Sequence, residues 1–212
     1  MILYANGDSH TAGVGLSPSE KTYADKLSKY YNLKLNNNAL SGASNAKIIR
    51  TTKEFLDKNA KVALILIGWS TWEREEWNYN GKYYNVNSSG YDQLPNEMKD
   101  EYKHWVSMQT PEVLNSKSTA WHKKIYDFHS ELVKRGIPHL FFNCMYNFFN
   151  VSDNEKLNWN LQYLHPYDNN YSYYWYLTQQ GYTADNWYHF GADGHQAWAD
   201  FLISYIKENN LL

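Results

Sequence analysis

A serine stands directly after the first predicted strand of the chain. Met1–Ala5 is a short apolar run bounded by Asn6 and Gly7, a pattern that predicts a buried strand leading into a tight turn, and Ser9 follows it. A serine hydroxyl is a weak nucleophile at neutral pH, so it needs an adjacent base and hydrogen-bond donors for the oxyanion that its attack on a carbonyl creates. Ser9 is therefore a candidate nucleophile if the chain supplies both.

Two segments resemble signature blocks of the SGNH (GDSL-like) hydrolase family. The stretch from Gly7 to Gly13, GDSHTAG, resembles the block whose serine is the nucleophile and whose own amide helps to form the oxyanion hole. The stretch NNNALSGASN, residues 36–45, resembles the block whose glycine amide is a second oxyanion donor. The resemblance implies that Ser9 is the nucleophile and that Gly42 donates to the oxyanion.

A third segment resembles the last block of the family. His189 to His195, HFGADGH, keeps the family spacing between a histidine and the Gly-His pair that opens the final helix. The resemblance implies that His189 is the catalytic base, whereas His195 is expected to pack or cap at the helix start. Cys144 ends a predicted strand, and we expect it to be a buried core residue and not a nucleophile.

Two positions depart from the family pattern. After the central strand the family has an asparagine where this chain has Ser70, whose shorter hydroxyl can donate to an oxyanion through a water or a repositioned loop. Three residues before the histidine the family has an aspartate where this chain has Asn186, with Asp185 one residue earlier. An asparagine amide holds an imidazole but does not stabilise imidazolium as a carboxylate does. Either Asp185 orients His189, or Asn186 holds it and activity is weak.

Aromatic and polar residues near these positions are candidates for substrate contact. The chain has 20 Tyr and 9 Trp residues, whose rings supply flat contact area with polar tips. Trp69 and Trp72 follow the central strand, and an acyl or sugar platform and core packing are equally weighted interpretations of them. Asp8 and His10 flank Ser9 and are further candidates, with an ordinary surface-loop role as the alternative for His10.

The elements that must position these residues alternate between strands and helices. This order implies a parallel sheet with right-handed crossovers, in which ligands bind beyond the carboxyl ends of the strands. We therefore expect a three-layer α/β/α sandwich with a central parallel sheet, and the resemblance implies the flavodoxin-like SGNH hydrolase fold. The predicted strands are 1–5, 33–35, 61–67 and 139–144, and the predicted helices start near Ser17, Ser44, Trp121 and Asp193.

The length of the chain, 212 residues, fits one domain. We expect a single domain over residues 1–212, because no linker composition or charge block marks a boundary. Two aromatic-rich stretches without sustained periodicity, at about 69–115 and 145–185, are expected to be insertions. The first of them is expected to wall the site.

Charge and composition restrict the partners and the location. The formal net charge of -2 provides no sequence-wide basic field of the kind that recruits nucleic acid. The apolar runs are shorter than the roughly 20 residues of a membrane-spanning helix, and the first residues lack a signal-peptide pattern. We expect a soluble protein that is cytoplasmic or virion-associated, since Asn- and Tyr-rich chains of this type resemble those of bacteriophages. One cysteine forms no internal disulfide and holds no metal alone, so no cofactor is expected.

These features predict a serine esterase or acylhydrolase that works through an acyl-enzyme, with a small-molecule or carbohydrate ester as substrate. O-acyl groups on carbohydrate are preferred because the aromatic stretches surround the predicted site. The alternative is a non-catalytic carbohydrate-binding or structural protein on a degenerate SGNH scaffold, which Ser70 and Asn186 favour. Acyl transfer to another acceptor uses the same serine, and the sequence does not separate it from hydrolysis.

Overall fold

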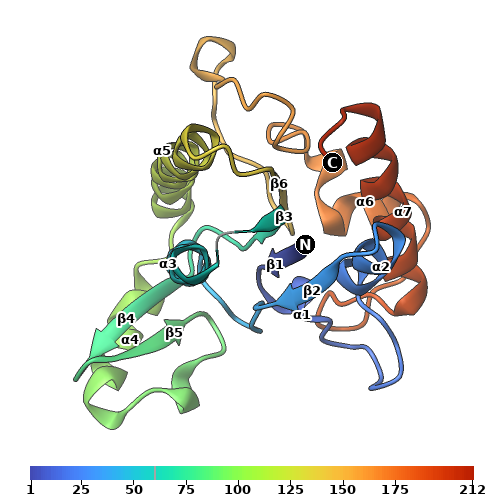
Figure 1. Cartoon of the computed structure of the whole chain (residues 1–212). Helices are drawn as coiled ribbons and strands as arrows, with labels where there is room; N and C mark the ends of the chain where they lie inside the picture. Colours follow the sequence, from blue (N-terminus) through green and yellow to red (C-terminus); the bar gives the residue numbers. More distant parts are fainter. Residues whose placement is uncertain (60) are drawn as a thin grey trace.

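The central sheet contains four parallel strands in the order β2-β1-β3-β6 (Figure 1). The computed structural model describes residues 1–59 and 61–212. Each strand overlaps a run that the sequence predicts as a strand. The strands are β1 Ile2–Asn6, β2 Lys34–Asn37, β3 Val62–Trp69 and β6 His139–Asn143.

The central strand β3 is buried at every residue after its first. Side chains alternate between the two faces of a sheet, so that Leu64 and Leu66 enter one apolar core, whereas Ile65 and Ile67 enter the other. A strand covered on both faces reads as a continuous apolar run, which is why this segment shows no alternation in the sequence. The two cores define the three layers of the predicted sandwich.

Helices cover both faces of the sheet (Figure 1). One layer consists of two helices and packs on the face of Ile65, and the other consists of three helices and packs on the face of Leu64. The predicted α/β/α architecture is therefore confirmed. The first layer contains α3 Asn45–Lys58 and α5 Pro111–Lys134, and the second contains α2 Tyr23–Tyr30, α6 Tyr173–Gln179 and α7 Ala192–Glu208.

The predicted start of the first long helix at Ser17 is wrong. The amide of Ser17 donates a hydrogen bond to the Glu20 carboxylate at 2.6 Å, but this contact closes only a turn. Helix α2 begins at Tyr23, where Thr22 and Asp25 form a reciprocal capping box. Two cap-like patterns thus stand close together in the sequence. The helix begins at the second, because only the residues after it form an apolar face that packs on the sheet.

The cap of the last helix also differs from the prediction. Gly191 occupies the cap position of α7, and Asp193 lies inside the first turn, where its carboxylate accepts a hydrogen bond from the Gly194 amide at 2.8 Å. A carboxylate in a first turn still stabilises the positive end of the helix dipole. The predicted cap of α3 is confirmed, because the Ser44 hydroxyl accepts a hydrogen bond from the amide three residues further on.

The first stretch expected to be irregular contains a hairpin and helices. Asn80 and Gly81 both have positive φ, of 49° and 77°, and form the turn between β4 and β5. An Asn-Gly pair is the strongest short-range sequence signal for such a hairpin. Helix α5 begins at Pro111, before residue 115, because Thr110 caps it there. The elements are β4 Glu75–Tyr79, β5 Lys82–Val86, η1 Tyr91–Gln93, η2 Asn96–Met98 and α4 Lys99–Ser107.

The second irregular stretch is bounded by β6 and α7. Besides α6 it contains two short 3-10 turns, η3 Asp153–Glu155 and η4 Asn169–Tyr171. No helix among residues 1–59 and 61–212 is both long and apolar enough to cross a membrane.

His195 of α7 holds the start of α2. Its Nδ1 atom accepts a hydrogen bond from the Tyr23 amide at 3.2 Å, and the two rings stack with their centroids 5.5 Å apart. Burial disfavours the charged imidazole and lowers the pKa of His195 from its ordinary value of 6.5 to about 4. His195 therefore packs at the start of α7 as the sequence predicts, but the helix whose amide it binds is α2.

We expect the free energy of unfolding to decrease as the pH falls from 6.5 to 4. The unfolded chain protonates His195 near pH 6.5 but the folded chain only near pH 4, so unfolding takes up a proton within this window. The shift corresponds to about 3 kcal/mol. Urea unfolding at several pH values measures the loss, which should be smaller in His195→Gln, a variant that keeps an acceptor and does not titrate. A wild-type stability that is constant across the window would contradict this prediction.

Candidate active site

Loops at the carboxyl edge of the sheet meet beside Ser9. The Leu40 amide, in the loop after β2, donates a hydrogen bond to the Gly7 carbonyl at 3.1 Å. The Asn45 side chain binds the backbone of Ser70 twice, accepting from its amide at 2.8 Å and donating to its carbonyl at 3.1 Å. These bonds tie together the three loops that carry the predicted nucleophile and oxyanion donors.

Ser9 is the first residue of the short helix α1, Ser9–Ala12. The N–H groups of a first helical turn have no acceptor within their helix, so the Ser9 amide is available to an oxyanion. The turn before it packs tightly on β3, because a Cβ at Gly7 would lie 2.8 Å from the Gly68 carbonyl oxygen. Glycine at this position therefore lets the serine approach the end of the sheet.

Asp8 is buried completely and is bound on both carboxylate oxygens. Its Oδ1 accepts a hydrogen bond from the His10 amide at 3.1 Å, which caps α1. Its Oδ2 accepts from the Ser70 hydroxyl and from Nη1 of Arg74, each at 3.2 Å. Asp8 thus has no exposed surface for the predicted substrate contact. Its hydrogen bonds hold α1 and the segment after β3 together.

Arg74 is a site residue that the sequence does not mark with any motif. Its Nη1 donates to the Ser70 hydroxyl at 2.8 Å as well as to Asp8. The Ser70 hydroxyl therefore accepts a hydrogen bond from the guanidinium and donates one to the Asp8 carboxylate. In this arrangement, Ser70 does not offer its proton to an oxyanion directly.

Removing the charge of Arg74 should destabilise the protein. Arg74→Met would leave the Asp8 carboxylate buried without a counter-charge, and we expect a loss of about 3 kcal/mol in the free energy of unfolding. Arg74→Lys should lose less because it keeps the charge. Urea denaturation measures both, with Arg135→Met as the control, since Arg135 belongs to an exposed ion pair worth at most about 1 kcal/mol. Equal stability of Arg74→Met and wild type would refute this account of the network.

The carboxylate that lies beside His189 belongs to Asp185. The distance from His189 Nδ1 to Asp185 Oδ2 is 3.6 Å, which is an ion-pair distance and somewhat longer than a hydrogen bond. Asp185 Oδ1 accepts hydrogen bonds from the amides of Trp187 and His189, both at 2.8 Å. These bonds, chiefly that from the His189 amide, lower the pKa of the Asp185 carboxyl, which stays ionised at neutral pH.

Asn186 lies exposed on the same loop. Among the hydrogen bonds between described residues, none involves its side chain. The loop itself is closed by backbone bonds, since the Asp185 amide donates to the His189 carbonyl at 2.8 Å. Of the two sequence alternatives for the residue that orients His189, this geometry favours Asp185.

His189 adjoins the segment that follows Ser9. The rings of His10 and His189 are 5.4 Å apart, and a Cβ at Gly15 would lie 3.1 Å from the Cβ of His189. No hydrogen bond between described residues joins the Ser9 hydroxyl to the His189 imidazole, and such catalytic bonds often tighten only in the substrate complex. Burial lowers the pKa of His10, which is 5 % exposed and therefore does not have the surface-loop role that was the alternative for it.

Trp69 and Trp72 belong to the core and do not form an exposed platform. Their exposures are 0 % and 2 %. Trp69 contacts the Phe141 ring edge-on at 5.0 Å, and Trp72 stacks on Phe148 at 4.8 Å. Trp69 is the last residue of β3 and faces the layer of α5, which explains its burial and supports the core-packing alternative.

Exposed aromatic side chains directly precede His189. Trp187 is 76 % exposed and Tyr188 is 55 % exposed. Tyr188 has a φ of 70°, which is unusual for a bulky residue, and its ring meets that of Tyr174 edge-on at 5.6 Å. Their positions next to the predicted base in the sequence are the signal that could have identified these residues.

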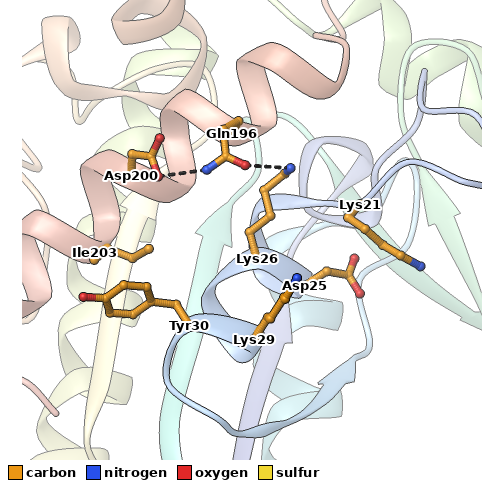
Figure 2. Close-up of a pocket in the computed structure, with 8 residues that line it drawn as sticks. All are labelled: Lys21, Asp25, Lys26, Lys29, Tyr30, Gln196, Asp200 and Ile203. Carbon is orange, nitrogen blue, oxygen red and sulfur yellow. Dashed lines mark hydrogen bonds between the residues drawn. The ribbon is translucent and has the colours of Figure 1, made fainter.

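A groove of about 650 Å³ lies between α2 and α7 (Figure 2). Two hydrogen bonds join side chains that line it: Lys26 donates to Gln196 at 2.9 Å, and Gln196 donates to Asp200 at 2.8 Å. None of its eight lining residues belongs to the network around Ser9. Within the described residues, no group of three or more His, Cys, Asp or Glu side chains is arranged to hold a metal ion.

The fold of this chain is similar to folds of solved structures. No protein-family model matches the chain, and no curated protein does. The solved structure of the psychrotrophic esterase EstA from Pseudoalteromonas sp. is similar, with 12 % identity, coverage of 98 % of this chain and 97 % of that chain, and a TM-score of 0.52. The structure of TesA is similar at 14 % identity, with 100 % of both chains covered and a TM-score of 0.57.

The first of these structures is that of an esterase. At such low sequence identity the similarity concerns the fold alone. This chain shares with them a central parallel sheet between two helical layers, which is consistent with the SGNH hydrolase fold that the sequence blocks predict.

Proposed function

We propose that this protein is a serine esterase in which Ser9 is the nucleophile and His189 the general base. The observation that carries the proposal is the Asp185 carboxylate at 3.6 Å from His189 Nδ1, with the His189 ring 5.4 Å from that of His10, the residue that follows Ser9 at the start of α1. A serine hydroxyl needs a base, and the base needs a group that orients it. Asp185 supplies the carboxylate that the family position, Asn186, lacks.

The reaction proceeds through an acyl-enzyme. His189 takes the Ser9 proton as the serine oxygen attacks the acyl carbonyl, and the amides of Ser9 and Gly42 donate to the oxyanion. Collapse of the tetrahedral intermediate breaks the ester bond, and the leaving alcohol receives the proton from His189. A water molecule then attacks the acyl-enzyme, His189 removes its proton, and the acid departs as Ser9 regains the proton.

The charge of Asp185 acts on His189 and not on the substrate. During each proton transfer the imidazole becomes imidazolium, which a neighbouring carboxylate stabilises. Asp185 is ionised for this role because two amide hydrogen bonds hold its charge. The Ser70 hydroxyl acts indirectly, by fixing Asp8 and with it the helix that presents Ser9.

The substrate that we propose is an O-acyl group on a carbohydrate. Trp187 and Tyr188 present exposed ring faces immediately before the base, and such rings combine an apolar face with a polar tip. The alternative, a non-catalytic binding protein on the same scaffold, is favoured in the sequence by Ser70 and Asn186. The Asp185 carboxylate beside His189 supports the esterase instead, and acyl transfer to a second alcohol would use the same groups.

A fluorophosphonate probe tests the proposal. We expect a single covalent adduct in the intact mass of the wild type, located on Ser9 by peptide mapping, and release of acetate from an acetylated sugar or p-nitrophenyl acetate. A phosphonate suits the test because EstA has been crystallised in a form inhibited by monoethylphosphonate. No adduct under conditions that fully label a control esterase, together with no ester turnover, would exclude the proposed function.

A further inference from the structure

The side chain of Asn87 lies over Gly42. Asn87 directly follows β5, and a Cβ at Gly42 would lie 2.7 Å from its Nδ2 atom. Gly42 has a φ of 73°, so the left-handed backbone and the approach of Asn87 both require glycine there. The hairpin thus brings an amide donor to the residue whose own amide is proposed to bind the oxyanion.

The orientation of the Asn87 amide is determined by its neighbours. Its Oδ1 accepts hydrogen bonds from the Ser89 amide and from the Ser89 hydroxyl, each at 3.0 Å. A backbone N–H only donates, so the atom facing it must be the carboxamide oxygen. Nδ2 is then the atom that faces Gly42, and among the described residues it has no hydrogen-bond acceptor.

The backbone of Asn87 is also held in place. Its carbonyl accepts hydrogen bonds from the Tyr102 hydroxyl at 2.9 Å and from the Gly90 amide at 3.1 Å. Val86, next to it, is fully buried with Tyr102 in a small apolar cluster between the hairpin and α4. Because backbone and side chain are both fixed, Nδ2 is a preorganised donor that needs no reorganisation when a charge develops.

Two ion pairs attach the hairpin to helices α3 and α5. Arg50 of α3 binds Glu76 of β4 through two hydrogen bonds, at 2.9 and 2.7 Å. Lys117 of α5 binds Glu75 at 2.7 Å. In Figure 1 the hairpin extends from the sheet below α3. Asn87, the residue after β5, approaches Gly42. The β4-β5 hairpin is therefore attached to the layer that contains α3 and α5.

We propose that Asn87 is a catalytic residue and that its Nδ2 is the third donor of the oxyanion hole. It takes the place of the amide that Ser70 lacks, since the Ser70 hydroxyl proton is directed to Asp8. Asn87 donates to the same oxygen as the amides of Ser9 and Gly42. This inference rests on the proposed esterase function and assigns a purpose to the inserted hairpin.

Asn87→Asp is the sharpest variant. A carboxylate of the same shape keeps the hydrogen bonds to Ser89 but replaces the donor by a charged acceptor. Losing one oxyanion donor lowers kcat by about 10² to 10³-fold, and we expect a loss of at least this size with KM changed less than about threefold. Affinity for a trifluoromethyl ketone, which forms an oxyanion on Ser9, should fall in parallel with kcat/KM. A merely structural role would not produce this parallel.

Two further variants make the test decisive. Asn78→Asp introduces the same charge at an exposed position of the same hairpin and should keep wild-type kinetics. Asn87→Ala removes the donor without adding charge and should show the same split between kcat and KM. If the wild type hydrolyses esters but Asn87→Asp stays within about fivefold of its kcat, the proposal is overturned. It is also overturned if both Asn87 variants lose their far-UV circular dichroism, because the side chain then serves the hairpin. If the wild type is neither labelled nor active, the proposed esterase function itself is refuted, and with it the role of Asn87.

Discussion

Ser9→Ala should lower kcat/KM for an ester substrate by at least about 10³-fold, because in the proposed mechanism Ser9 forms the acyl-enzyme. Ser9 stands at the start of α1, and its side chain is not used by the network of Asp8, Ser70 and Arg74 that holds this end of the sheet. The variant should therefore keep its fold while losing its chemistry. Initial rates with p-nitrophenyl acetate, corrected for spontaneous hydrolysis, measure the loss.

Ser116→Ala is the matched control for this variant. Ser116 lies exposed on α5, where alanine favours the helix, and we expect rates equal to those of the wild type. Labelling by the fluorophosphonate should persist in this control and disappear in Ser9→Ala. If Ser9→Ala kept more than about a tenth of the wild-type rate, another nucleophile would have to perform the reaction.

The central strand was predictable because consecutive residues along it are buried. Residues 61–67 form an uninterrupted apolar run after one lysine, and this run became the central strand β3. Helix starts depend on more than the local pattern. Ser17 and Glu20 form the same kind of hydrogen bond as a true capping box, yet only the later box at Thr22 is followed by residues that pack against α7 and the sheet.

The site likewise contains residues that the sequence predicts and residues that only the folded structure reveals. Ser9 and Gly42 follow strands β1 and β2 within a few residues, so short motifs and strand order were enough to propose them. Arg74 contacts Asp8 across 66 residues of sequence, and only the folded chain shows that the charge of one neutralises the other. Asn87 is separated from Gly42 by the whole of α3, β3 and the hairpin. No local pattern predicts such contacts, although Asn80-Gly81 does predict the turn that makes the hairpin.

Asp185→Asn tests which residue orients the base, and we expect it to lower kcat by about 10³-fold. The change is clean because an asparagine keeps the carbonyl oxygen that accepts from the amides of Trp187 and His189. The loop and the unusual φ of Tyr188 should therefore survive, while the negative charge next to the imidazole disappears. KM should change little, since Asp185 does not contact the substrate in this proposal.

Asn186→Asp supplies the opposite comparison. It restores an aspartate at the family position, and if Asp185 already stabilises the imidazolium the new carboxylate should change kcat by less than about threefold. Kinetics of both variants, with far-UV circular dichroism as a check of the fold, separate the two arrangements. An Asp185→Asn variant with wild-type kcat, or a large gain in Asn186→Asp, would show that the base of the natural chain lacks a carboxylate partner. In that case Asp185 would only close the loop, and the enzyme would be intrinsically slow.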